Sequence, residues 1–132
     1  MRFNGHNLLA IVAAAIAIYL IEFVIFAVLI SPEQYQAMVG VTAEQLHPVR
    51  MAFGVISPIL AAIGLSLVVK WRNALGFMGG AMTGVWMAIF FAFAASLYGF
   101  VYGSNTETLM AVHLGHFVVC YAVAGGILGV WK

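Results

Sequence analysis

The chain has 132 residues, of which 65% are hydrophobic and 7% are charged, and its formal net charge is +1. A soluble domain of this length carries charge on about a quarter of its residues, so this composition excludes a soluble fold. The sequence contains no basic run, which excludes nucleic acid as a partner. We therefore expect an integral membrane protein surrounded by the lipid bilayer.

Four apolar runs account for almost the whole chain, and each is about long enough to cross a bilayer once. They cover about residues 8–30, 48–69, 74–102 and 109–131. The connections are short, which favours antiparallel neighbours. The sequence thus predicts an all-α fold, a four-helix up-down transmembrane bundle that forms a single domain over residues 1–132.

The charges of the connections predict the orientation of this bundle. Four of the five Lys and Arg residues lie near the chain ends or in the second connection: Arg2, Lys70, Arg72 and Lys132. Since Lys and Arg accumulate on the cytoplasmic side, both termini are expected inside, N-in and C-in. Trp71 and Trp131 are expected to anchor the chain at this border.

The first connection is predicted to contain a helix of its own. Ser31-Pro32-Glu33 is typical of a helix start, with a capping hydroxyl and a proline in the first turn, and Gly40 ends the segment. We expect a short outer interfacial helix at about 32–39, and both a binding lid and a plain surface turn remain open. Thr42-Ala43-Glu44-Gln45 then has the pattern of a second helix start.

The third apolar run has a face without side chains. Gly76, Gly80 and Gly84 recur every four residues, which predicts close approach of another helix backbone. Gly125 and Gly129 form a shorter version in the fourth run. The partner helix can belong to this chain or to another copy, and we predict an oligomer formed through the glycine face of the third run.

Glu22 is the one charged residue in the first apolar run. It lies about 21 Å along that helix from its predicted cytoplasmic end, and His113 and His116 reach a similar depth on the fourth run. An ionisable group inside a bilayer normally has a partner, so we predict that Glu22 meets one of these imidazoles. Further polar candidates fall in the same outer half: Tyr19, Arg50, Ser57 and Tyr98.

Four uses of this polar cluster remain open. It can be a structural pair that sets helix register, a proton- or ion-handling site, a small-ligand or headgroup pocket, or a metal site. Glu22, His113 and His116, with Cys120 as a further ligand, are weak metal candidates because their spacing is not diagnostic. The chain carries no known catalytic motif, so we predict no catalytic residues and no cofactor. An enzyme stays open as a third alternative, which would need a lipid-soluble substrate that reaches Glu22 and His116 from the outer leaflet.

Two functions from different classes follow. The first is a non-enzymatic structural or accessory subunit of a membrane assembly, either a homo-oligomer or part of a larger complex. The second is a small transporter or channel-like protein, in which Glu22 and the two histidines bind a proton, a cation or a small ligand.

Three segments resemble an uncharacterised bacterial family of small four-helix integral membrane proteins, catalogued as a domain of unknown function. They are Glu22-Phe23-Val24-Ile25-Phe26, the loop from Tyr35 through Gly40, and the glycines at 76, 80 and 84. The family has Gly at the position of Glu22 and Trp-Tyr at the position of Ile25-Phe26. The resemblance implies a four-helix fold in a bacterial inner membrane and supplies no activity.

Overall fold

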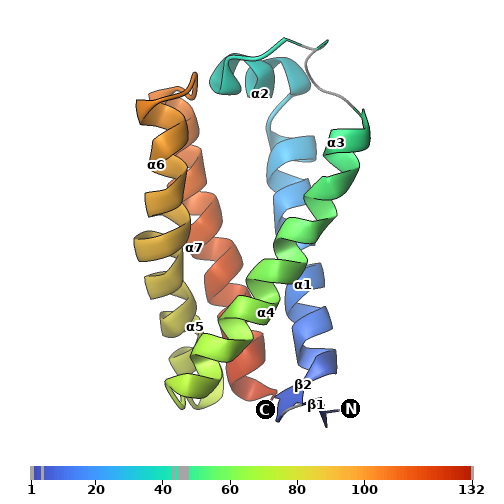
Figure 1. Ribbon diagram of the computed structural model, residues 1–132, viewed down its shortest axis with the longest axis vertical. Helices are drawn as coiled ribbons and strands as arrows, with labels where there is room; N and C mark the ends of the chain where they lie inside the picture. Colours follow the sequence, from blue (N-terminus) through green and yellow to red (C-terminus); the bar gives the residue numbers. More distant parts are fainter. Residues whose placement is uncertain (1, 4, 43, 45–47, 132) are drawn as a thin grey trace.

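The computed structural model describes residues 2–3, 5–42, 44 and 48–131 (Figure 1). A short β-hairpin, in which β1 (Arg2–Phe3) pairs antiparallel with β2 (His6–Asn7), precedes the first helix. Apart from this hairpin, the described elements are all helical. Four helices of the described chain are long and apolar enough to cross a membrane: Leu8–Leu29, Phe53–Trp71, Gly76–Val101 and Glu107–Val130. This arrangement agrees with the all-helical fold expected from the composition.

Three of these long helices contain a change of helix type. The first consists of α1 (Leu8–Phe23) and the π-helix η1 (Val24–Leu29). The second consists of the 3₁₀ turn η3 (Phe53–Val55) and α4 (Ile56–Trp71), and the short helix α3 (Pro48–Ala52) directly precedes it. The third consists of α5 (Gly76–Met87), the π-helix η4 (Ala88–Phe93) and α6 (Ala94–Val101). The fourth is α7 (Glu107–Val130), which Thr106 caps by accepting from the Leu109 amide. Hydropathy does not reveal such changes, because they alter hydrogen bonding without altering composition.

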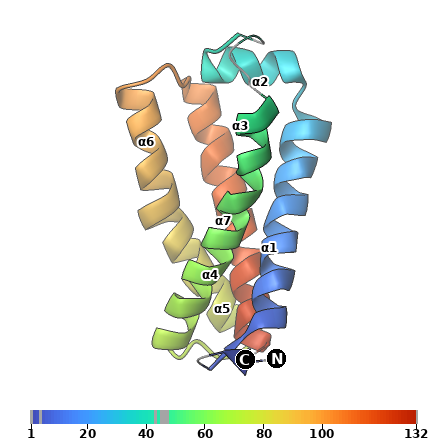
Figure 2. The same ribbon diagram turned by 45° about the vertical axis from the view of Figure 1, so that its right-hand side comes forward.

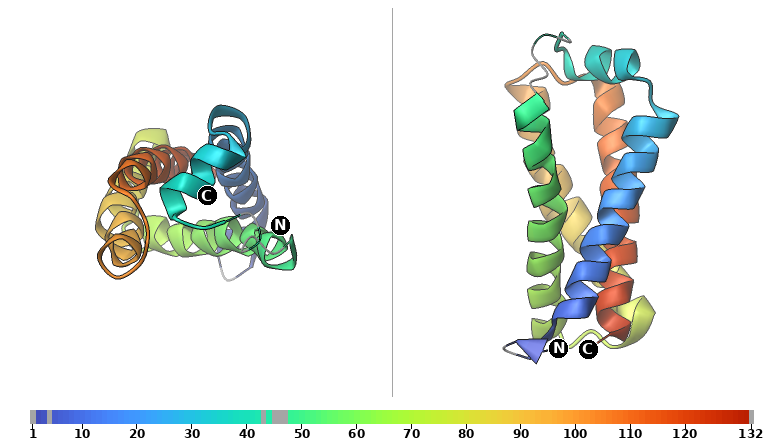
Figure 3. Two further views of the ribbon diagram at one scale, coloured as in Figure 1. Left: turned by 90° about the horizontal axis from the view of Figure 1, so that it is seen from above. Right: turned by 90° about the vertical axis from the view of Figure 1, so that its right-hand side faces the viewer.

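A short helix, α2 (Pro32–Val39), lies across the end of the structure opposite the hairpin (Figure 3). Ser31 Oγ accepts from the Gln34 amide at 3.2 Å, and Gln34 Oε1 accepts from the Ser31 amide at 2.9 Å. Gly40 ends α2 in the left-handed conformation, with φ +73°. The capped helix predicted from this segment is confirmed. The second predicted start, at residues 42–45, lies partly outside the described residues.

The helix α7 contacts α1, α4, α5 and α6, and Figure 2 shows it behind α4 and between α1 and α6. Its contacts with α1 and α4 form the buried core toward the hairpin end. Each helix contributes three core residues: Ala10, Ala14 and Ile18; Ala62, Leu65 and Val69; and Cys120, Ala124 and Leu128. Ala74, in the second connection, joins this core. The small residues among them let the three helix backbones approach closely.

The glycine face of α5 packs against α7 of the same chain. A Cβ atom at Gly80 would meet the backbone of Gly125, and one at Gly84 would meet the carbonyl of Tyr121. A Cβ at Gly129 would meet the carbonyl of Gly76. The predicted close packing is therefore present, but the predicted use of this face by a second copy is wrong, because α7 already occupies it.

Candidate functional site

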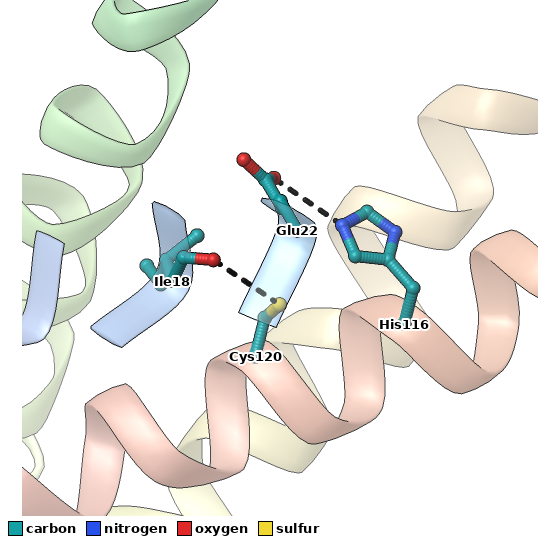
Figure 4. A network of polar contacts seen from close by, with 4 residues as sticks. All are labelled: Ile18, Glu22, His116 and Cys120. Atoms are coloured by element: carbon teal, nitrogen blue, oxygen red, sulfur yellow. Dashed lines mark hydrogen bonds and ion pairs between the residues drawn. The ribbon is translucent and has the colours of Figure 1, made fainter. Parts of the chain in front are cut away.

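Glu22 and His116 meet between α1 and α7, as Figure 4 shows. The Nε2 atom of His116 lies 3.2 Å from Oε1 of Glu22. The His116 side chain is 6% exposed and that of Glu22 is 28% exposed, so the pair is mostly shielded. The structure thus brings together the carboxylate and one of the two imidazoles that depth alone placed at a similar level.

One helical turn closer to the hairpin end, α1 and α7 meet again through Ile18 and Cys120. The thiol of Cys120 points to the carbonyl oxygen of Ile18, with 3.9 Å between Sγ and O (Figure 4). Both residues are fully buried and begin the apolar core formed by α1, α4 and α7. The polar pair therefore lies at the boundary between a dry core and a more open region near α2.

A half-enclosed pocket of about 440 Å³ adjoins the pair on its α2 side. Its lining comes from η1, α2, α3 and α7: Phe26, Pro32, Tyr35, Met51, His113 and His116. The ring of Phe26 packs edge-on against His116, with centroids 5.1 Å apart, and against Tyr35 at 5.8 Å. A mostly apolar hollow with a few polar groups is typical of small-molecule sites.

Both imidazoles of this pocket have an unsatisfied nitrogen. Among the described residues, Nδ1 of His113 and Nδ1 of His116 are buried and have no hydrogen-bond partner. The two rings are neighbours, with centroids 6.1 Å apart. Buried polar atoms without partners cost stability, and in native proteins each needs an explanation such as water or a ligand.

The protonation of the Glu22–His116 pair decides what His116 Nδ1 can do. When Glu22 is ionised and His116 is neutral, the Nε2–H donates to the carboxylate and Nδ1 is an acceptor. One added proton gives either imidazolium with carboxylate or imidazole with carboxylic acid. Nδ1 carries hydrogen in both forms, because Nε2 must accept from the acid in the second. A single proton therefore converts Nδ1 from an acceptor into a donor.

The helix α2 is held over this region by hydrogen bonds from the connection that precedes α7. Ser104 Oγ donates to the carbonyl of Val39 at 2.7 Å, and Thr106 Oγ1 donates to the carbonyl of Met38 at 3.0 Å. The Thr106 amide donates to the same Met38 carbonyl. These bonds satisfy carbonyls at the end of α2, which would otherwise lack intrahelical partners.

The structure also describes the surroundings of three other polar candidates. Tyr19 is half-exposed beside an apolar hollow between α1 and α4, and Ser57 is exposed. Tyr98 is 69% exposed and stacks on Tyr102 with centroids 6.1 Å apart. Their membership of the cluster stays a prediction, because similar depth does not specify the direction of a side chain. The side chain of Arg50 lies outside the described part of the structure.

The metal hypothesis receives no support from the geometry. Within the described residues, no group of three or more His, Cys, Asp or Glu side chains is arranged to hold a metal ion. Glu22 pairs with His116, whereas His113 lies beside His116 on the side toward α2. Two donors fall short of the three or four protein ligands of usual zinc sites.

The apolar half of the site carries little signal in the sequence. Phe26 follows Glu22 by four residues, a spacing that would have placed both on one helix face. Tyr35 was named only as the start of a loop in the family resemblance, and Met51 carried no signal. These residues reach the pocket from η1, α2 and α3. Their meeting depends on how the first connection folds back.

Comparison with known proteins gives one assignment. Neither the search of curated proteins nor that of solved structures gives a match. The family model described as "Protein of unknown function (DUF1761)" matches residues 9–129, which is nearly the whole chain. The protein therefore belongs to the DUF1761 family, in agreement with its resemblance to a domain of unknown function.

Proposed function

We propose that the protein is a small proton-linked carrier in a bacterial inner membrane, built as an up-down bundle of four spans in one domain. In this proposal the hairpin end, with both chain termini, faces the cytoplasm, and the α2 end faces outward. The positive charges of Lys70 and Arg72 support this orientation, since the second connection lies at the hairpin end (Figure 1).

The observation that carries the proposal is the combination of the Glu22–His116 pair with the adjoining pocket. A pair that only fixes helix register needs no cavity and no unsatisfied nitrogen. Here the pair is continuous with a half-enclosed pocket and with two buried Nδ1 atoms that lack partners among the described residues. The proton-dependent change at His116 Nδ1 gives the pair a means of coupling proton uptake to binding of a small hydrogen-bonding solute.

The arrangement corresponds to one state of a carrier rather than to an open channel. The pocket lies on the outer side of the pair, while Ile18, Cys120 and the apolar core close the inner side. Transport then requires a second conformation in which this core opens. The π-helices η1 and η4 are suitable places for bending, because π-helical turns interrupt regular helical hydrogen bonding and are frequent at functional sites.

An accessory-subunit role stays a prediction, as does association with further copies or other membrane proteins. The polar pocket is the reason for placing the carrier first, since an accessory role gives no account of it. Any oligomer must also use a surface other than the glycine face of α5, which α7 covers.

Proton flux into liposomes tests the proposal directly. The full chain is reconstituted with pyranine inside the vesicles, and a potassium diffusion potential drives proton entry between pH 5 and pH 8. We expect flux several-fold above protein-free vesicles and a loss of most of it in Glu22→Gln, which cannot exchange a proton. His116→Gln should have the same effect and serves as a second variant if Glu22→Gln does not fold.

Glu33→Gln is the matched control, because it makes the same chemical change on α2, outside the long helices. It should leave flux unchanged. Flux no greater than in protein-free vesicles across this pH range, or equal flux in Glu22→Gln and the wild type, would overturn the carrier proposal.

A further inference from the structure

A second cavity, of about 220 Å³, lies at the hairpin end, far along α1 and α7 from the Glu22–His116 pair. It is bounded by the hairpin, α1, α4, the second connection and the end of α7. Its polar lining is His6, Asn7, Ser66, Lys70, Asn73 and Trp131. Apolar lining comes from Ala10, Val69 and Leu128.

The wall of this cavity depends on how the hairpin folds back on α4. His6 Nδ1 lies 2.8 Å from the hydroxyl oxygen of Ser66, which ties β2 to α4. Gly5 has φ +77°, and a Cβ atom there would lie 2.6 Å from Nζ of Lys70. The absence of a side chain at Gly5 therefore lets the ammonium group of Lys70 lie against the hairpin backbone.

The polar lining suits a phosphate group. Lys70 supplies a cation, and Asn7, Asn73 and Trp131 have side chains with N–H donors. Among the described lining residues there is no carboxylate, so nothing in that lining repels an anion. A strongly hydrated ammonium group is a common phosphate partner.

The position of the cavity favours a lipid over a soluble ion. It lies at the ends of long apolar helices, and its lining includes Trp131, whose amphipathic ring is typical of a membrane interface. Polar groups and apolar residues line the same hollow, so an occupant with a charged head and a hydrocarbon part fits both. Basic pockets between transmembrane helices on the cytoplasmic side are known to hold anionic headgroups.

We propose that this cavity binds the phosphodiester headgroup of an anionic phospholipid, with Lys70 as its main charged contact. The site is separate from the proposed carrier pocket and does not depend on it. The headgroup would bridge the hairpin and α4, and so fasten the amino-terminal segment to the membrane surface.

Native mass spectrometry of the full chain in detergent tests the proposal, with phosphatidylglycerol and phosphatidylcholine at equal concentration as probes. We expect selective retention of phosphatidylglycerol and a loss of affinity of about tenfold in Lys70→Gln. Lys70→Arg keeps the charge and should keep the preference. Asn73→Asp, which places a carboxylate in the lining at nearly the same size, should abolish it and replaces Lys70→Gln if that variant does not fold.

Arg72→Gln is the matched control, because it removes the same charge two residues further along the chain, at the end of α4, where the side chain does not line the cavity. The Arg72 guanidinium donates instead to Thr83 Oγ1 at 2.9 Å. Equal losses in Lys70→Gln and Arg72→Gln would mean diffuse attraction to positive charge and would overturn the site. Equal retention of both lipids would overturn it as well. Full displacement of phosphatidylglycerol by millimolar inorganic phosphate would overturn the assignment to a lipid.

Discussion

Nε2 of His116 lies 3.2 Å from Oε1 of Glu22, one helical turn beyond the contact between the Cys120 thiol and the Ile18 carbonyl. The two contacts are successive because α1 and α7 run in opposite directions and present a residue to each other every four positions. One contact is polar and adjoins a pocket, and the next is fully buried. The boundary between site and core is therefore a single helical turn thick.

The energetic value of the polar pair can be measured by removing one partner or both. His116→Leu should lower the free energy of unfolding by about 1–3 kcal/mol, because Glu22 is left mostly shielded without its partner. The double variant Glu22→Leu/His116→Leu should recover much of this loss, since two apolar groups need no partner. Denaturant unfolding in mixed micelles, followed by circular dichroism, measures both. A double variant no more stable than His116→Leu would contradict this expectation.

We expect Gly80→Ala and Gly115→Ala to differ widely in their effect on stability, although both add one methyl group. Gly80→Ala should lower stability by about 1–3 kcal/mol or more, because its Cβ would meet the backbone of Gly125, which cannot move aside easily. Gly115→Ala is the control: among the described residues, nothing lies within 4 Å of a Cβ there. It should be neutral or slightly stabilising, because alanine favours helix more than glycine. Thermal unfolding compares the two, and similar losses would contradict the packing described.

Cys120, the only cysteine in the sequence, reports on the closed core. Its side chain is fully buried, so N-ethylmaleimide should modify the native protein far more slowly than the denatured protein. Tyr102→Cys in a Cys120→Ala background is the accessible control, because Tyr102 is 82% exposed at the α2 end. Mass spectrometry of timed samples gives both rates. Fast native modification of Cys120 would show that the core opens readily.

The contribution of Glu33 to the stability of α2 is expected to depend on pH. The pKa of Glu33 lies below its usual 4.5 because its own backbone N–H and the Ser31 side chain stabilise the carboxylate. A lowered folded-state pKa contributes stability above the unfolded pKa, and this contribution is lost as the pH falls through the folded value. Ser31→Ala should raise the Glu33 pKa and weaken α2 by about 1 kcal/mol through loss of the cap. Carboxyl NMR titration measures the pKa, and an unchanged value would contradict the contact.

Features of the fold that depend on groups close together in the sequence were predicted best. Ser31, Pro32 and Gly40 predict a helix whose cap and end are present, because capping involves groups only a few residues apart. The periodic glycines predict close packing, which is also present. Pairing between Glu22 and His116 was a weaker inference from depth alone, since depth does not specify which way a side chain points. The placement of Tyr19, Ser57 and Tyr98 in the same cluster stays a prediction.

Composition and periodicity by themselves determined that the chain is helical, apolar enough for a membrane, and equipped with a carboxylate at a depth where it needs a partner. Those properties follow from the cost of exposing backbone and charge to lipid, which acts on each segment separately. Only the tertiary structure decided that α7 covers the glycine face of α5. It also decided that Phe26, Tyr35 and Met51 adjoin the histidines, and that the hairpin folds over Lys70. These contacts depend on how distant segments are rotated and tilted against one another, and no local pattern encodes that relation.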